Sequence, residues 1–192
     1  MNYAVFARFG KTKTALVIAF LWGLAEGLVF FVVPDVYVGF VAIFSASAGL
    51  SALVFSVIGS LVSAVVVFLV TPLLGKNLNH LLLHIPGISE KMIQGVVHAL
   101  QTNGFLSLIN APLSGVPYKI YSVNAALQHF PLFQYLLWSI PSRLERILPV
   151  TIVALILGRL FKKNILAFTT IWIVGYALLW VIIYIFYYHS LS

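Results

Sequence analysis

The sequence predicts an all-α, polytopic integral membrane protein with two re-entrant helical hairpins and several transmembrane helices, built as a single membrane domain over residues 1–192. The first observation is composition: 62% of the residues are apolar, 8% are charged, and the mean hydropathy is +1.09. Soluble domains are about 45–50% apolar and about 25% charged. The others are long charge-free stretches and two apolar segments broken by proline and glycine. Together they exclude a soluble enzyme, a nucleic-acid-binding protein and a disordered chain.

The few charges are mostly basic, with eleven bases against four acids and a net charge of +7. Two basic clusters flank apolar runs, which is the positive-inside pattern that sets topology. We therefore expect an integral protein of the bacterial inner membrane with a cytoplasmic N-terminus, an even number of crossings between the clusters, and the C-terminus outside. We expect no cleaved signal peptide. The clusters are Arg8, Lys11 and Lys13, and Arg159, Lys162 and Lys163.

Charge-free stretches define the expected spans. The 40 residues between Asp35 and Lys76 are too many for one crossing at about 1.5 Å per residue through about 30 Å of hydrocarbon. A turn at Gly49–Ser51 would divide them and leave a transmembrane helix over 51–74. Two more transmembrane helices are expected over 131–158, where prolines interrupt an apolar run, and over 165–188, which ends in an aromatic belt. The interrupting prolines are Pro141 and Pro149.

Two apolar segments are predicted to be re-entrant hairpins, because proline and glycine break a helix and freed backbone groups need protein or water at membrane depth. The first covers 14–49 and the second 104–128. Paired interruptions in the two halves of a chain are typical of a transporter binding site. The residues expected to break these hairpins are Pro34, Pro112, Gly115 and Pro117.

The polar connector 76–103 separates the hairpins. Ser89 is a predicted N-cap and Glu90 lies in the first helical turn that follows. The apolar residues of 88–100 are spaced for one helix face, so this amphipathic helix is expected to lie on the membrane surface.

Two carboxylates are the candidate proton-coupling residues. An ionised, unpaired Glu26 within an apolar run would cost about 2.5–3.5 kcal/mol on insertion scales, so it should face a cavity or a partner. Glu26 either carries a proton or pairs with a buried arginine that fixes the packing. Asp35 follows Pro34 at the expected hairpin tip, where an interfacial turn residue is the alternative reading.

Three bases are the candidate lipid-phosphate ligands. Lys119 follows the broken backbone of the second hairpin, where free N–H groups and a cation suit a phosphate, although a snorkelling lysine would look the same. Arg143 and Arg146 lie one helical turn apart, and two guanidinium groups on one face suit bidentate phosphate binding. They could equally pair with Glu26 or Asp35.

Catalysis, metals and cofactors find little support in the sequence. The five histidines include one i, i+4 pair, His80 and His84, but no further ligand lies in reach, so no metal site is expected. The absence of cysteine excludes thiolate sites and cysteine nucleophiles. Membrane phosphatases, phosphatidyltransferases and intramembrane serine proteases each need residues that this chain lacks. We therefore expect neither an enzyme nor a cofactor.

These features in combination resemble the DedA superfamily of membrane proteins, also called VTT or SNARE-associated proteins, in its short YqaA-like branch. The resemblance covers about residues 14–160. It is carried by Glu26, by Pro34-Asp35, by the second hairpin ending in Val116-Pro-Tyr-Lys-Ile-Tyr, and by Ser142-Arg-Leu-Glu-Arg146. Many members have an arginine before the proline of the second hairpin, and this chain has no base between Lys91 and Lys119.

The resemblance implies a flippase or scramblase that moves undecaprenyl phosphate or a phospholipid, coupled to protons or sodium. It implies that Glu26 and Asp35 are the acidic pair and that Lys119, Arg143 and Arg146 are the basic residues. The expected partners are membrane lipids through their phosphate headgroups, with no nucleic acid and with homo-oligomerisation left open. The alternatives are a membrane assembly or homeostasis protein that transports nothing, and a small-cation exporter, which would need no phosphate-binding bases.

Overall fold

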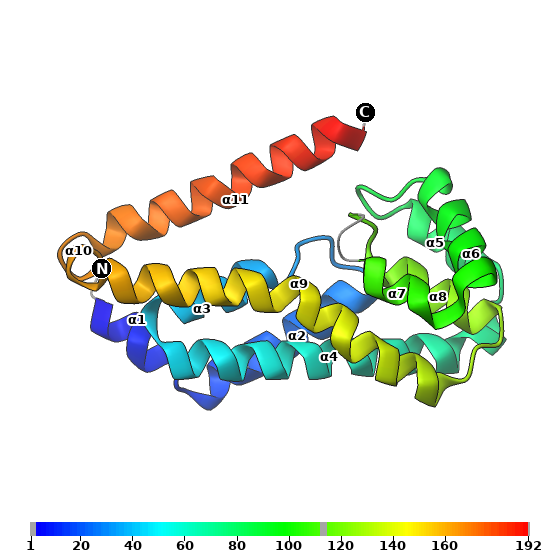
Figure 1. The fold of residues 1–192 in the computed structure, drawn as a ribbon, viewed down its shortest axis with the longest axis horizontal. Coiled ribbons are helices and arrows are strands. Elements are labelled where there is room, and N and C mark those ends of the chain that lie inside the picture. Colours follow the sequence, from blue (N-terminus) through cyan, green and yellow to red (C-terminus); the bar gives the residue numbers. More distant parts are fainter. Residues whose placement is uncertain (1–2, 112–114, 192) are drawn as a thin grey trace.

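A computed structural model describes residues 3–111 and 115–191, and within those residues the protein is helical and has no strand. Helices α2, α4 and α11 run one way along the long axis, while α3 and α9 return (Figure 1). The helices are α1 (Tyr3–Phe9), α2 (Lys13–Leu28), α3 (Asp35–Phe44), α4 (Ala46–Leu74), α5 (Asn77–Leu83), α6 (Glu90–Asn103), the 3₁₀ turn η1 (Gly104–Leu106), α7 (Ser107–Asn110), α8 (Tyr118–Leu127), α9 (Leu132–Leu160), α10 (Lys162–Ala167) and α11 (Thr169–Leu191).

Helices α4 and α11 are long and apolar enough to span a membrane, with mean hydropathies of 2.8 and 2.0. They differ in their surroundings, because α4 is nearly half buried whereas only 6% of α11 is buried within the protein. A helix that is apolar all round and exposed on most of its surface needs a nonaqueous environment or a partner. The composition and these two helices therefore agree on a membrane location.

Small residues bring α2 and α4 together. A Cβ atom added to Gly23 would overlap the carbonyl of Ser56, and one added to Gly59 would overlap the carbonyl of Phe20. The Ser60 hydroxyl, which is fully buried, donates to the carbonyls of Ser56 and Gly23. Close backbone approach of this kind is how helices associate within a membrane, because the hydrophobic effect does not drive helices together in lipid.

The first long apolar stretch is divided earlier than the sequence predicted. The turn expected at Gly49–Ser51 is wrong: α4 runs unbroken from Ala46, and the chain reverses at Ser45, whose backbone is extended. Gly49 instead lets two helices approach, since a Cβ there would overlap Ala42 of α3. A glycine needed for close packing looks the same in the sequence as a glycine that makes a turn.

Helix α9 continues through both of its prolines, which were expected to interrupt it. It bends in its middle (Figure 1), close to Glu145. Proline removes the hydrogen bond to the carbonyl four residues earlier, so Pro149 frees the carbonyl of Glu145 and accounts for a bend there. The bend lies beside the two arginines Arg143 and Arg146, which face α2 and α3.

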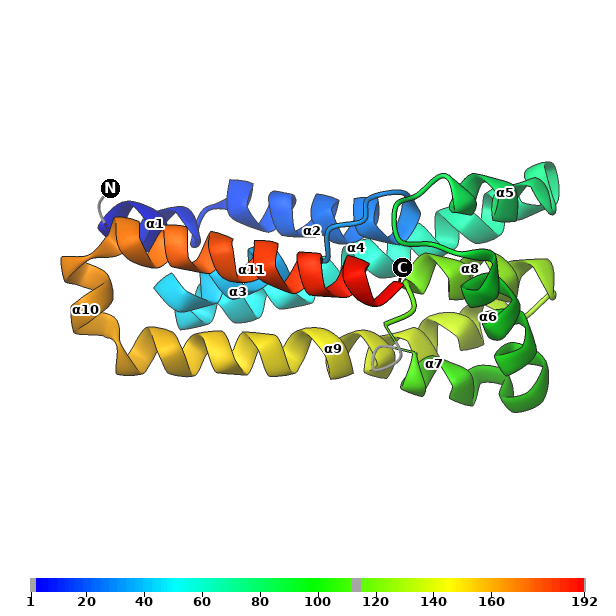
Figure 2. The same cartoon turned by 90° about the horizontal axis from the view of Figure 1, so that it is seen from above.

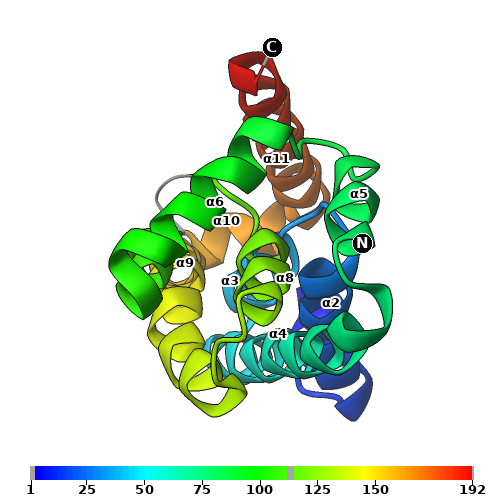
Figure 3. The same cartoon turned by 90° about the vertical axis from the view of Figure 1, so that its right-hand side faces the viewer.

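The connector forms α5 and α6, and its expected cap is confirmed: Ser89 Oγ accepts a hydrogen bond from the N–H of Met92. Its apolar face, with Ile93, Val96 and Leu100 buried, packs on α8 rather than standing free. Seen end-on, α8 lies between α4 and α6 (Figure 3). All residues of α8 from Tyr118 to Ala126 are buried.

The close approach of α2 and α4 can be tested with glycine substitutions. We expect Gly59→Ala to destabilise the protein by about 1–3 kcal/mol, because the new methyl meets backbone that cannot move aside. Gly95→Ala in α6 is the control, since a Cβ there meets nothing within 4 Å. Thermal unfolding in detergent should separate the two variants, and equal midpoints would contradict this account of the packing.

Candidate functional site

Three of the predicted site residues meet in the interior at Glu26 of α2. Arg143 of α9 donates a hydrogen bond to Glu26 Oε2, and Lys119 Nζ of α8 lies 4.0 Å from Glu26 Oε1. Each of the three residues is 2% exposed. Residues distant in the sequence thus form one buried ionic cluster that links three helices.

A second ion pair lies next to the first. Arg146 donates from Nε and from one terminal nitrogen to Asp35 Oδ2, at 3.2 and 3.1 Å. Asp35 begins α3 and is 2% exposed, whereas the side chain of Arg146 is 20% exposed. Because Arg143 and Arg146 are one turn apart, a single stretch of α9 holds both carboxylates. Of the two arginines, Arg146 is therefore the one that a ligand can reach more easily.

Arg143 is also held from its other side. Its guanidinium carbon lies 3.9 Å from the centre of the Tyr118 ring, within the range of a cation–π interaction. The Tyr118 hydroxyl donates to Ser139 Oγ at 2.8 Å, so α8 and α9 are joined at the same level. Arg143 is thus fixed between a carboxylate and an aromatic face.

The broken segments meet beside this cluster. The break after α2 ends at Pro34, directly before α3, and the break before α8 ends at Pro117. Gly115 has a φ of 72°, which glycine adopts without strain, and Pro112 lies outside the described residues. Lys119 Nζ donates to the carbonyl of Phe30 at 3.2 Å, so a side chain of α8 satisfies a backbone carbonyl in the break after α2.

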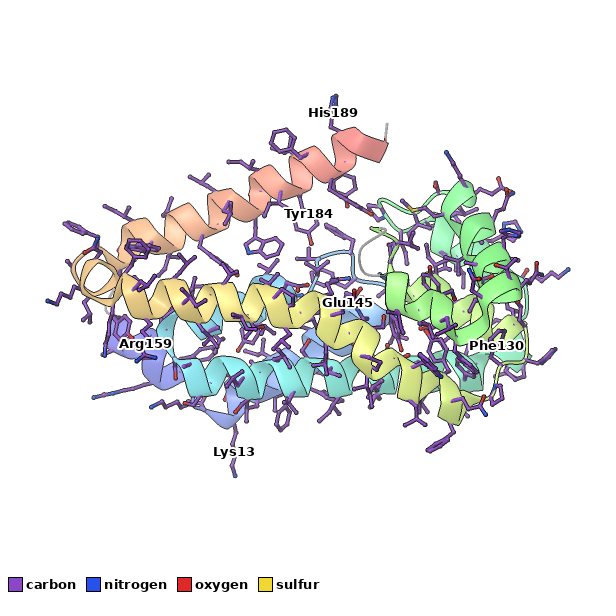
Figure 4. All side chains as sticks on the ribbon, in the orientation of Figure 1. Lys13, Phe130, Glu145, Arg159, Tyr184 and His189 are labelled. Atoms are coloured by element: carbon purple, nitrogen blue, oxygen red, sulfur yellow. The ribbon has the colours of Figure 1, made fainter. Side chains whose placement is uncertain are left out.

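The cluster borders a cavity of about 340 Å³, referred to below as the central cavity. Both breaks, the α5–α6 linker and the C-terminal half of α11 enclose it. Tyr184 points from α11 toward the body of the protein, whereas His189 points away (Figure 4). The charged residues that line the cavity are Glu26, Asp35, Lys119 and Arg146.

Tyrosine hydroxyls hold α11 over the central cavity. Tyr184 accepts a hydrogen bond from the N–H of Val33 at 2.8 Å, and Tyr176 donates to the carbonyl of Val36 at the same distance. Tyr187 donates to the carbonyl of Gly115 at 3.3 Å. Helix α11 therefore contacts both the segment that leads into α3 and the segment that precedes α8, and from above it lies across α3 (Figure 2).

The cluster carries one positive charge in excess, with three cations against two carboxylates. Lys119 has three donors, of which one binds a carbonyl, and its distance to Glu26 is long for an ion pair. Asp35 Oδ1 and Arg143 Nε make no hydrogen bond to any residue that the structure describes. Buried positive charge without full compensation is costly, so the excess at Lys119 favours a ligand that brings negative charge, while Asp35 Oδ1 remains open to a hydrogen-bond donor.

The structure brings all five predicted charged residues together, but they do not all line the same pocket. Lys119 and Arg146 line the central cavity, whereas Arg143 lines a much smaller pocket between α8 and α9. Sequence reasoning missed the wall contributed by α11 and assigned its tyrosines to an interfacial belt. The signal was present, because aromatic residues recur every fourth position, so that each contacts the next along a stripe that winds slowly around the helix: Trp172, Tyr176, Trp180, Tyr184 and Tyr188.

Away from the charged cluster, Asn124 of α8 exchanges hydrogen bonds with Asn79 of α5 at 3.1 and 3.2 Å. Among the described residues no group of three or more histidine, aspartate or glutamate side chains could hold a metal ion.

Comparison with family models, with curated proteins and with solved structures finds no match for this chain. The geometry of the charged cluster and its cavity is therefore the basis for a functional assignment.

The asymmetry of the buried cluster predicts unequal effects of its neutral variants. Glu26→Gln leaves Arg143 and Lys119 as facing cations, so we expect a loss of about 3–5 kcal/mol in the free energy of unfolding. Arg143→Gln should cost less, because Lys119 still compensates Glu26. Thermal unfolding in detergent checks the order. Glu145→Gln is the control, since Glu145 makes no ion pair with the residues that the structure describes. A larger loss of stability for Arg143→Gln than for Glu26→Gln would contradict this account of the charged cluster.

Proposed function

We propose that the protein moves a lipid phosphate across the membrane, with its headgroup bound in the central cavity. The observation that carries the proposal is the buried cluster with one positive charge in excess, which opens on a cavity inside an apolar protein. Phosphate is the common anionic group of membrane lipids, and it can accept several charge-assisted hydrogen bonds at once. Undecaprenyl phosphate and phospholipids are the two substrate classes that we propose.

Lys119 and Arg146 are the proposed phosphate ligands. Both line the central cavity, both come from helices that are fixed by buried contacts, and Lys119 retains unused donors. Arg143 is a positioning residue in this proposal, because its guanidinium already binds Glu26 and packs on Tyr118. It orders the site and places Glu26 near Lys119.

Asp35 is the proposed switch. It competes with a phosphate for Arg146, because Asp35 Oδ2 accepts both of the hydrogen bonds that Arg146 donates to it. Protonation of Asp35 removes its negative charge and weakens the pair, which frees Arg146 for the headgroup. Deprotonation restores the pair and expels the phosphate. A proton gradient would thereby give the cycle a direction, with the two hairpins as the moving parts.

Transport can be tested in liposomes that contain undecaprenyl phosphate, by following access of an outer-leaflet reagent with and without a pH gradient. We expect accelerated, gradient-dependent access. Arg146→Gln and Lys119→Gln should each slow it roughly tenfold or more, as expected when one charge-assisted hydrogen bond is lost. Lys91→Gln is the charge-matched control on the exposed face of α6.

Other outcomes would replace the proposal. Gradient-independent access of many lipids would indicate a scramblase. Without any acceleration by folded protein, the charged residues only hold the helices together, and the protein is then an assembly partner of another membrane protein.

A further inference from the structure

A second hollow lies between α9 and α11, with a volume of about 690 Å³. Val150, Val153 and Leu157 form the α9 wall, and Trp172, Tyr176 and Leu179 stand on the α11 wall. Its side chains are almost entirely apolar. We call this hollow the α9–α11 groove. It exists because α11 diverges from α9 after the α10 turn (Figure 1).

The groove lies directly beside the central cavity. Val150, Trp180 and Ile183 line both spaces, so these side chains form a shared wall between them. The aromatic stripe of α11 forms a common wall, in which the rings of Tyr176, Trp180 and Tyr184 follow one another at centroid distances of 6.4 and 6.3 Å. A chamber with charged lining and an apolar chamber therefore lie next to each other along α11.

We infer that the α9–α11 groove binds the hydrocarbon chain of an anionic lipid whose phosphate occupies the central cavity. This inference rests on the proposed function for the headgroup and adds a binding site for the hydrocarbon tail. The two chambers match the two parts of one amphiphile, since charged side chains that include Lys119 and Arg146 line one end and apolar and aromatic side chains line the other. A soluble phosphate has no hydrocarbon chain that the apolar groove could bind.

The occupant is identified by this joint geometry rather than by apolarity alone. In a membrane a chain that enters the groove leaves an equally apolar environment, so the hydrophobic effect gives no net gain. Binding must then come from packing in the groove and from the phosphate held at its end. A lipid without the phosphate should therefore not compete for the groove.

Gly175 offers a way to fill the groove without disturbing the helices. It lies on the groove wall, and a Cβ atom added there would meet nothing within 4 Å. Gly175→Phe should occupy the space of the chain. Ala177→Phe is the matched control, because two positions along a helix place it on the opposite face of α11. Val153→Phe fills the same groove from α9 and serves if the first variant fails to fold.

The experiment uses the full-length protein in phosphatidylcholine vesicles and a dodecyl phosphate that carries a diazirine at the end of its chain. After illumination, labelled residues are mapped by mass spectrometry. We expect labels on the groove residues of α9 and α11. Unlabelled dodecyl phosphate should displace the probe, whereas dodecanol and butyl phosphate should not. Gly175→Phe or Val153→Phe should lose the labels and slow transport, and Ala177→Phe should keep both.

Each alternative outcome has a definite meaning. Competition by dodecanol would show that the groove takes any bilayer chain and would overturn the inference. Labelling that falls as the protein-to-lipid ratio rises, at a constant ratio of probe to lipid, would overturn it in favour of a second copy as the occupant. Normal transport without labels in the groove would overturn the tail site and leave the proposed function standing. Normal transport by Gly175→Phe would have the same meaning. Phosphate-dependent labelling without transport would support the tail site and contradict the proposed function.

Discussion

The ion pair between Glu26 and Arg143 is the interaction on which the rest of the interior depends. It lies where α2, α8 and α9 meet, and its two residues are among the most buried in the protein. A charge at that depth is tolerated only with a partner of opposite charge. The pair therefore sets the relative positions of three helices. Its immediate neighbours are Lys119, which also binds the carbonyl of Phe30 in the broken segment, and Tyr118.

This dependence explains why the site needs broken helices. A continuous helix in place of the segment after α2 would satisfy its own carbonyls, and Lys119 would lose its acceptor at Phe30. The break instead leaves backbone groups that a charged side chain can bind. The second break does the same for Tyr187 of α11 through Gly115. The irregular backbone is thus part of the site and not only a connection between helices.

Much of the site could be predicted from the sequence, because charge is scarce and each charged residue within an apolar segment must be accounted for. Glu26, Asp35, Lys119, Arg143 and Arg146 stand out on that ground, and they do meet. Which cation binds which carboxylate could not be predicted, since both arginines share one face of α9. That choice depends on the bend near Glu145 and on the contact with Tyr118, which are set by packing over distant residues.

The sequence was less informative where one residue type serves two purposes. Gly49 looked like a turn and instead allows α3 and α4 to touch, because glycine suits both. The α11 aromatics looked like a belt at the membrane surface, and their four-residue period was the only sign that they form an inner wall. The helical class and the helix cap at Ser89 were predictable from local patterns. The enclosure of a cavity by α11 was not, because it follows from the placement of a whole helix.

The hydrogen bonds that hold α11 end on backbone atoms at Val33, Val36 and Gly115 rather than on side chains. Backbone groups are the same whatever residue carries them. The side chains at positions 33 and 36 are therefore free to diverge among related sequences while α11 keeps its register. Selection for a different ligand could alter these positions one at a time, and each intermediate would keep α11 over the site.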